Sequence, residues 1–292
     1  MVEPGDFYSN PQTAFDNFFQ QEMKNISREK INASALKEFH AFENKLTLAG
    51  IDVTVCRQDD GLMTPDAVFP NNWFSTHPEG TIVLYPMNAG NRRLERRPGI
   101  IVQLRKSYSR LVDLTNHESN NKSLEGTGSL VIDHAHGITY ASLSQRTDPA
   151  VLKKWSEEMN HELITFTSYD SNQQIIYHTN VMMCLADEFA VVCMDAIRSD
   201  EERKAVQSRL IATQHEIIEI SMEQMHHFCG NCLALENTSG KKLLAMSDNA
   251  YNHFTKDQLR TIETYCSIIH SNLETLETFG GGGARCMLAE LF

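Results

Sequence analysis

Residues 280–288 read Gly-Gly-Gly-Gly-Ala-Arg-Cys-Met-Leu and contain the only run of glycines in the 292-residue chain. Glycine lets a backbone approach a ligand closely and adopt positive φ values. Cys286 follows this run and enters a short apolar segment. We therefore expect its thiol at the mouth of a loop, where Arg285 beside it can help to hold a thiolate. The alternative is a buried structural cysteine, the commoner role of a lone cysteine.

Cys286 also begins the last of five similar segments. Each combines a polar or glycine-rich loop, a short apolar strand, a turn and often a second strand, and their first residues lie 56, 52, 51 and 55 positions apart. Helical stretches at 148–161, 199–213 and 254–273 separate consecutive segments. This recurrence predicts an α/β ring with pseudo-fivefold symmetry whose five loops converge on one site, and an open α/β sheet is the alternative. The segments begin at Asn72, Gly128, Asn180, Asn231 and Cys286.

Near the start of the chain, residues 27–49 predict a helix. Apolar side chains recur at helical spacing between Ile31 and Leu46, which is typical of a helix with one buried face. Asn25 or Ser27 is the expected N-cap, because a short polar side chain can accept a hydrogen bond from the first free backbone N–H groups.

The composition indicates one globular domain over residues 1–292, since no linker or low-complexity tract divides the chain. The net charge of −12 disfavours nucleic acid and anionic membranes as partners, because both are bound by clustered Lys and Arg. The most apolar long stretch, 181–194, is interrupted by Asp187 and Glu188, so no membrane span is expected. With no visible secretory signal and seven scattered cysteines, we expect a cytoplasmic protein with reduced thiols.

Three polar residues lie in loops near the segment starts. His178 can exchange protons with a ligand there, although a chain with 12 His also places them in cores and on surfaces. Glu125 has small neighbours that give access to its carboxylate. Asp66 follows Pro65 and either binds substrate nitrogens or makes an Asx turn.

Two arginines are candidates to bind a carboxylate, for which the planar guanidinium is suited. Arg146 is the first. Arg93 is the second, but it belongs to the basic run 91–97, so a solvated face is an equal alternative for it.

Cys229 and Cys232 follow two histidines and resemble a zinc or redox pair. A zinc site needs about four ligands, and the sequence lacks a second motif of this kind. We therefore read this pair as structural and expect neither a metal nor a cofactor.

Residues 282–287, Gly-Gly-Ala-Arg-Cys-Met, resemble the nucleophile motif of arginine deiminases. Other motifs of the arginine-deiminase and amidinotransferase superfamily follow the right order, and the resemblance extends from about residue 60 to the end. It implies a five-bladed α/β propeller, the pentein fold. Residues 69–77 and 125–129 look closest to the citrulline-hydrolase branch. The other matching segments are 65–69 for substrate binding, 124–126 for the acidic residue, 143–147 for carboxylate binding and 178–180 for the catalytic histidine.

The resemblance implies that the Cys286 thiolate attacks a planar carbon bonded to nitrogen in a small amino acid. An amine leaves, and water then hydrolyses the covalent adduct. His178 is implied to protonate the leaving amine and to deprotonate the water. Glu125 and Asp66 are implied to bind substrate nitrogens, and Arg146 is implied to bind the α-carboxylate.

The chain departs from deiminases at three places. Asn71 and Asn72 stand where deiminases carry a carboxylate. Gly128 and Ser129 stand where they carry an aspartate, and Asn180 replaces the aspartate two residues after the histidine. A guanidinium has only donors and favours charged acceptors, whereas a ureido group also has a carbonyl oxygen that needs a donor. An asparagine amide supplies both a donor and an acceptor, so it suits a ureido group. Citrulline is the simplest amino acid with such a group, and we expect its hydrolysis to ornithine, ammonia and carbon dioxide.

Three other functions are compatible with the sequence. An arginine dihydrolase or deiminase on the same fold would bind a guanidinium with Asp66 and Glu125. A binding protein without activity would carry Cys286 as an incidental residue. A zinc- or redox-dependent protein would use Cys229 and Cys232. A homo-oligomer is also compatible with the sequence, which does not fix the oligomeric state.

Overall fold

The computed structural model describes residues 1–21, 26–57 and 61–292. They form an α/β fold with four three-stranded sheets of one topology, in which the first two strands are antiparallel and the third is parallel to the second. Helices connect the second and third strands, as a parallel connection requires. The sheets are β1 (Phe74–His77), β2 (Thr81–Leu84) and β3 (Arg110–Asp113); β4 (Val131–Asp133), β5 (Ile138–Ser142) and β6 (Glu162–Phe166); β7 (Met183–Leu185), β8 (Phe189–Val192) and β9 (Glu216–Glu219); and β10 (Leu233–Glu236), β11 (Lys242–Ser247) and β12 (Ser267–Ser271).

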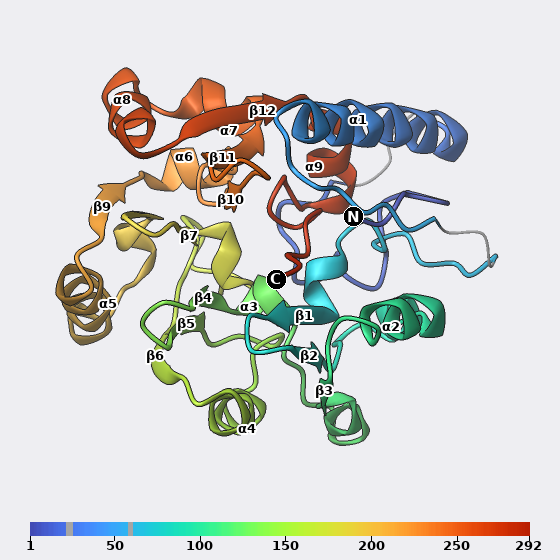
Figure 1. The fold of residues 1–292 in the computed structure, drawn as a ribbon, viewed down its shortest axis with the longest axis horizontal. Coiled ribbons are helices and arrows are strands. Elements are labelled where there is room, and N and C mark those ends of the chain that lie inside the picture. Colours follow the sequence, from blue (N-terminus) through green and yellow to red (C-terminus); the bar gives the residue numbers. More distant parts are fainter. Residues whose placement is uncertain (22–25, 58–60) are drawn as a thin grey trace.

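The sheets surround a central region in which the C-terminus lies, and longer helices lie at the periphery (Figure 1). None of the helices in the described ranges combines the length and the apolar character that a bilayer crossing needs. The connecting helices are α2 (Pro98–Leu104), α4 (Pro149–Met159), α5 (Asp200–Ala212), α7 (Asp248–His253) and α8 (Lys256–Tyr265); the others are α1 (Arg28–Leu48), α3 (Gly126–Ser129), α6 (Met222–His226) and α9 (Glu274–Gly280). Short 3-10 helices are η1 (Pro70–Asn72), η2 (Asn91–Glu95), η3 (Thr115–Asn120), η4 (Thr179–Val181) and η5 (Met194–Ala196).

The predicted N-terminal helix is confirmed as α1. The Ser27 hydroxyl caps it by accepting a hydrogen bond from the Lys30 N–H at 3.4 Å, and Asn25 lies outside the described residues. The predicted helices at 148–161 and 199–213 are confirmed as α4 and α5. The prediction for 254–273 is wrong in its second half, because its β-branched residues form β12 and pair with β11.

The fifth segment differs from the prediction. Residues 284–287 form a turn, and no strand is assigned to 286–289, where we expected one. The backbone N–H groups of Cys286 and Met287 donate to carbonyls within this turn, at 3.1 and 3.3 Å. They are therefore not available to a β ladder. Four of the five predicted units are sheets in the part of the chain that the structure describes.

The residues after Cys286 are tied to the first sheet and its neighbours. The Thr76 hydroxyl donates to the Glu290 carbonyl at 2.7 Å, and the Tyr108 hydroxyl donates to the Phe292 carbonyl at 2.7 Å. Arg285 pairs with the Glu290 carboxylate at 3.1 Å. These bonds hold the turn that carries the thiol.

Deleting residues 289–292 is expected to inactivate the protein and to lower its unfolding free energy by about 3 kcal/mol. The deletion removes three anchoring bonds, each of which contributes about 1 kcal/mol. The measurements are a thermal melt and a turnover assay. Phe292→Ala is the matched control, because its backbone carbonyl remains. A truncated protein with full activity would show that the terminal residues do not position Cys286.

Candidate active site

Five of the predicted residues line one small pocket, together with Arg92 and residues from the N-terminal segment. Its volume of about 10 Å³ is roughly the room that one water molecule needs. The predicted residues arrive from loops far apart in the chain, which the fold brings together. The lining consists of Asn17, Asp66, Phe69, Asn72, Arg92, Arg146, Tyr177, His178, Gly280, Gly281, Gly282 and Cys286.

The Cys286 thiol is buried and held by two asparagines. Its Sγ lies 3.3 Å from the side-chain nitrogen of Asn231 and 3.6 Å from that of Asn180. Burial raises the pKa of Cys286, and the hydrogen bond from Asn231 and the charge of Arg285 oppose this rise. Gly281 has φ +64°, and a Cβ on it would lie 2.5 Å from the Asn17 amide. The glycine at this position therefore lets the backbone lie close to the Asn17 side chain.

His178 contacts the Glu125 carboxylate. Its Nε2 lies 2.9 Å from Glu125 Oε2, and both side chains are buried. Burial lowers the pKa of His178, and Glu125 opposes this shift. Burial alone would raise the pKa of Glu125, but Arg146, His178 and Arg92 hold it well below its usual range. Burial therefore favours the neutral thiol and the neutral imidazole, whereas the neighbouring cationic groups favour the ionised carboxylate.

Gly128 makes room for two side chains of the pocket. A Cβ at this position would lie 2.5 Å from the Asn72 side-chain nitrogen and 2.7 Å from the His178 ring. Distances below 3 Å force a neighbour to move. Gly128 therefore lets Asn72 and His178 lie close together.

Arg146 is buried in the pocket wall, as predicted, and it is already paired. Its Nε donates to Asp16 at 2.9 Å and its Nη2 also contacts Asp16. Its Nη1 lies 3.4 Å from Glu125, and its guanidinium lies over the Tyr177 ring at 4.5 Å. A substrate carboxylate would have to replace Asp16 on this guanidinium.

Arg93, a predicted carboxylate-binding residue, does not line this pocket. Its Nε donates to the Met87 carbonyl at 3.0 Å, and it pairs with Glu118 at 3.5 Å. The neighbouring Arg92 is buried in the pocket wall instead. Both residues lie in η2, where successive side chains point in directions about 120° apart, so only one of them faces inward.

Arg285, which we expected beside the Cys286 thiolate, also lies outside the pocket lining. Its Nη1 donates to the Leu288 carbonyl at 3.0 Å, and its Nη2 pairs with Glu290. It contributes to the site through its charge near Cys286.

Several buried polar atoms around the pocket have no hydrogen-bond partner among the described residues. Asn72 donates nothing from its side-chain nitrogen, although its Oδ1 accepts from Arg92 Nη1 at 2.8 Å. Asp66 Oδ1, Asn180 Oδ1 and both side-chain polar atoms of Asn71 are also without partners, and Asn71 and Asn180 do not line the pocket. Buried polar atoms are normally paired, so those that face the pocket indicate a ligand with both donors and acceptors.

Several residues around the pocket carry no recognisable signal in the sequence. Asn10 and Thr13 donate to Asp66 at 2.7 and 3.3 Å, and Asp16 binds Arg146. These three lie before residue 60, where the resemblance begins, and no local pattern marks them. Asn231 could have been found, because it opens the fourth repeated segment as Asn72 and Asn180 open theirs.

Cys229 and Cys232 are buried, in agreement with their structural reading. The Cys229 thiol bonds the Ala250 carbonyl at 3.4 Å, and the Cys232 thiol bonds the Cys229 carbonyl at 3.4 Å. Burial raises the pKa of Cys229 to about 12, so the thiol stays protonated.

Comparisons with known proteins identify the family and the fold of the chain. A family model described as eukaryotic N,N dimethylarginine dimethylhydrolase matches residues 3–292. No curated protein matches by sequence. ArgZ, a cyanobacterial arginine dihydrolase, is similar in structure with a TM-score of 0.74 and 15% identity, over 98% of this chain and 39% of ArgZ. The chain thus spans about two fifths of that protein.

Two further structures cover most of both chains. The N-terminal domain of ArgZ bound to product has a TM-score of 0.75 and 16% identity, over 98% of this chain and 94% of that one. An adduct of dimethylarginine dimethylaminohydrolase with S-methyl-L-thiocitrulline has a TM-score of 0.66 and 14% identity, over 98% and 96%. At these identities the likeness shows the shared α/β fold.

Proposed function

Because this chain belongs to the N,N dimethylarginine dimethylhydrolase family, we propose that it is a hydrolase of carbon–nitrogen bonds that uses Cys286 as nucleophile and His178 as acid and base. Citrulline is the proposed substrate. Ornithine, ammonia and carbon dioxide are the proposed products. The reaction consumes one water molecule.

The resting protonation state suits this chemistry. As Cys286 Sγ bonds to the ureido carbon, the thiol proton passes to His178, and the ionised Glu125 stabilises the imidazolium. His178 then gives this proton to the departing nitrogen as its bond to carbon breaks. Water attacks the carbon of the covalent cysteine adduct, and His178 takes a proton from this water. The carbon–sulfur bond then breaks, and His178 returns the proton to the sulfur. The carbamic acid released decomposes to an amine and carbon dioxide, whichever nitrogen leaves first.

The orientation of the Asn72 side chain favours a ureido substrate over a guanidinium. Arg92 has only donors, so the atom of Asn72 that faces it at 2.8 Å must be the carbonyl oxygen. The Asn72 nitrogen is then the atom left to contact a ligand, and it can donate to a ureido oxygen. Asp66, whose Oδ1 has no partner among the described residues, provides an acceptor for the N–H groups.

An arginine dihydrolase or deiminase is the second candidate. The similar structures include an arginine dihydrolase, and the pocket contains the Asp66 carboxylate with Glu125 close by. A guanidinium, however, has no acceptor for the Asn72 nitrogen. Buried donors left without an acceptor cost about 1–3 kcal/mol. We therefore rank citrulline first.

We propose one catalytic domain over residues 1–292 in which the C-terminal segment completes a five-bladed propeller, closest to the citrulline-hydrolase branch. Arg146 is proposed to bind the substrate α-carboxylate after Asp16 leaves it, with no cofactor taking part. A cytoplasmic location is proposed, and a homo-oligomer is compatible with it.

Product analysis tests the reaction. Incubation with citrulline should release ornithine and ammonia in equal amounts. Incubation with arginine distinguishes the second candidate, since a dihydrolase releases two ammonia molecules per ornithine and a deiminase releases citrulline. Failure to consume citrulline, with consumption of arginine, would replace the proposal by the second candidate.

Asn72→Asp is expected to lower kcat/KM for citrulline about 10- to 100-fold and to improve binding of arginine. The new carboxylate repels the ureido oxygen but forms a charge-assisted bond with a guanidinium, and such bonds contribute about 1.5–3 kcal/mol. Both substrates are measured by steady-state kinetics. Asn71→Asp is the matched control, because the same change then falls outside the pocket lining. An unchanged ratio in Asn72→Asp would show that Asn72 does not contact the reacting group.

A further inference from the structure

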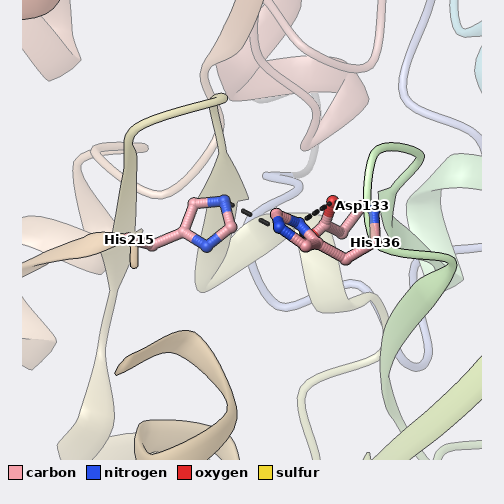
Figure 2. Close-up of side chains that lie close together, drawn as sticks. All are labelled: Asp133, His136 and His215. Atoms are coloured by element: carbon pink, nitrogen blue, oxygen red, sulfur yellow. Dashed lines mark hydrogen bonds and ion pairs between the residues drawn. The ribbon is translucent and has the colours of Figure 1, made fainter. Parts of the chain in front are cut away.

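Asp133, His136 and His215 form a cluster outside the candidate active site. Asp133 ends β4 and His136 lies in the turn before β5, whereas His215 approaches from the segment before β9 (Figure 2). Asp133 Oδ2 is 2.9 Å from His136 Nδ1 and 4.0 Å from His215 Nε2. One nitrogen or oxygen atom of each residue lies within 4.8 Å of the others.

The two ring nitrogens of His215 have separate neighbours. The Thr213 hydroxyl, which donates to helix carbonyls of Arg209 and Leu210 at 3.0 and 3.1 Å, lies 2.8 Å from His215 Nδ1. His215 Nε2 lies 4.0 Å from the Asp133 carboxylate. In the Nδ1–H tautomer, the lone pair of Nε2 faces this carboxylate, and a cation between the two acceptors is favoured.

An Asx turn explains only part of the cluster. The His136 N–H donates to Asp133 Oδ1 at 3.0 Å, which orients the carboxylate and closes the turn. This bond does not involve His215, a buried residue from another sheet. Metal-binding histidines usually donate their second ring N–H to a fixed acceptor, and Thr213 is such an acceptor here.

We propose that Asp133, His136 and His215 bind a divalent transition-metal ion of the zinc class. Two imidazoles and one carboxylate suit zinc rather than magnesium or calcium, and the remaining coordination positions would hold water. Ligand atoms around a tetrahedral zinc lie about 3.4 Å apart, so the cluster needs small side-chain rotations. Zinc would replace the proton that His136 now shares with Asp133.

The position of the cluster makes it accessible. Asp133 and His215 line a surface cavity of about 530 Å³, and the side chain of His136 is 42% exposed. The ion would join the β4–β5 hairpin to the segment that precedes β9 in the neighbouring sheet. A zinc concentration about 100 times Kd should therefore raise Tm by on the order of 5 °C.

Zinc titration against a chromophoric chelator tests the site. The full chain carries Cys286→Ser in every sample, because the active-site thiol can also bind zinc. This background protein should bind one zinc ion. His136→Ala and Asp133→Asn should weaken binding at least about 100-fold, and Thr213→Val about 10- to 100-fold.

His270→Ala is the matched control. His270 pairs with Asp248 at 2.6 Å and is 38% exposed, but this pair belongs to no three-residue cluster among the described residues. The His270→Ala substitution should leave the zinc affinity unchanged. The proposal is overturned if the Cys286→Ser protein binds no zinc, or if its zinc affinity survives His136→Ala and Asp133→Asn.

Discussion

Replacing Cys286 with serine is expected to lower kcat at least about 10³-fold while the fold is retained. The hydroxyl can accept the same hydrogen bonds from Asn231 and Asn180 that now reach the thiol at 3.3 and 3.6 Å. An alcohol is a far weaker nucleophile than a thiol unless a strong base activates it. Losses of this size are typical when a covalent nucleophile is removed.

Ammonia release, a thermal melt and citrulline binding by calorimetry separate chemistry from folding in this variant. Cys266→Ser is the control, since Cys266 is half-buried, its thiol bonds the Ile262 carbonyl, and it does not line the pocket. Binding should survive in the Cys286 variant and turnover should not. Activity within tenfold of the wild type would exclude Cys286 as the nucleophile.

His178→Ala is expected to lower kcat/KM by about 10²- to 10⁴-fold, the usual contribution of a general acid–base group. Its pH profile should change as well. In the wild type, protonation of His178 removes the base on the acid side, at a pH below the ordinary histidine pKa because burial lowers it. Loss of the Cys286 proton ends activity on the alkaline side, above the ordinary cysteine pKa because burial raises it. These two limbs belong to the coupled pair.

The variant should lose the acid limb, and its residual rate should rise as Cys286 ionises. Glu125→Gln provides a second measurement, because Glu125 opposes the lowering of the His178 pKa. Without this carboxylate the acid limb should move to lower pH. If His178→Ala keeps both limbs, another group exchanges the protons.

Much of the site could be predicted from local patterns in the sequence. Asp66, Asn72, Arg146, His178 and Cys286 lie in ordered motifs, and the structure places all five in one pocket. The glycine run was informative because a side chain at Gly281 would collide with Asn17. Helix α1 was predictable because its buried residues recur with the period of a helix.

Contacts between distant segments could not be predicted. Asp16 and Arg146 are 130 residues apart in the chain, and nothing near either residue indicates the other. Arg92 lines the pocket and Arg93 does not, because their side chains point in different directions from η2. The run of arginines in the sequence does not indicate these directions. The terminal turn replaced a predicted strand because its N–H groups bond locally, a choice that an apolar segment alone does not reveal.

The selectivity of the unmodified protein tests the ureido assignment most directly. The measurement is kcat/KM for citrulline, arginine and N,N-dimethylarginine, with substrate consumption followed and with ornithine, citrulline, ammonia and dimethylamine quantified for each. The donor nitrogen of Asn72 predicts that citrulline exceeds both guanidinium substrates by at least about 100-fold. A higher kcat/KM for arginine or N,N-dimethylarginine than for citrulline would contradict the assignment.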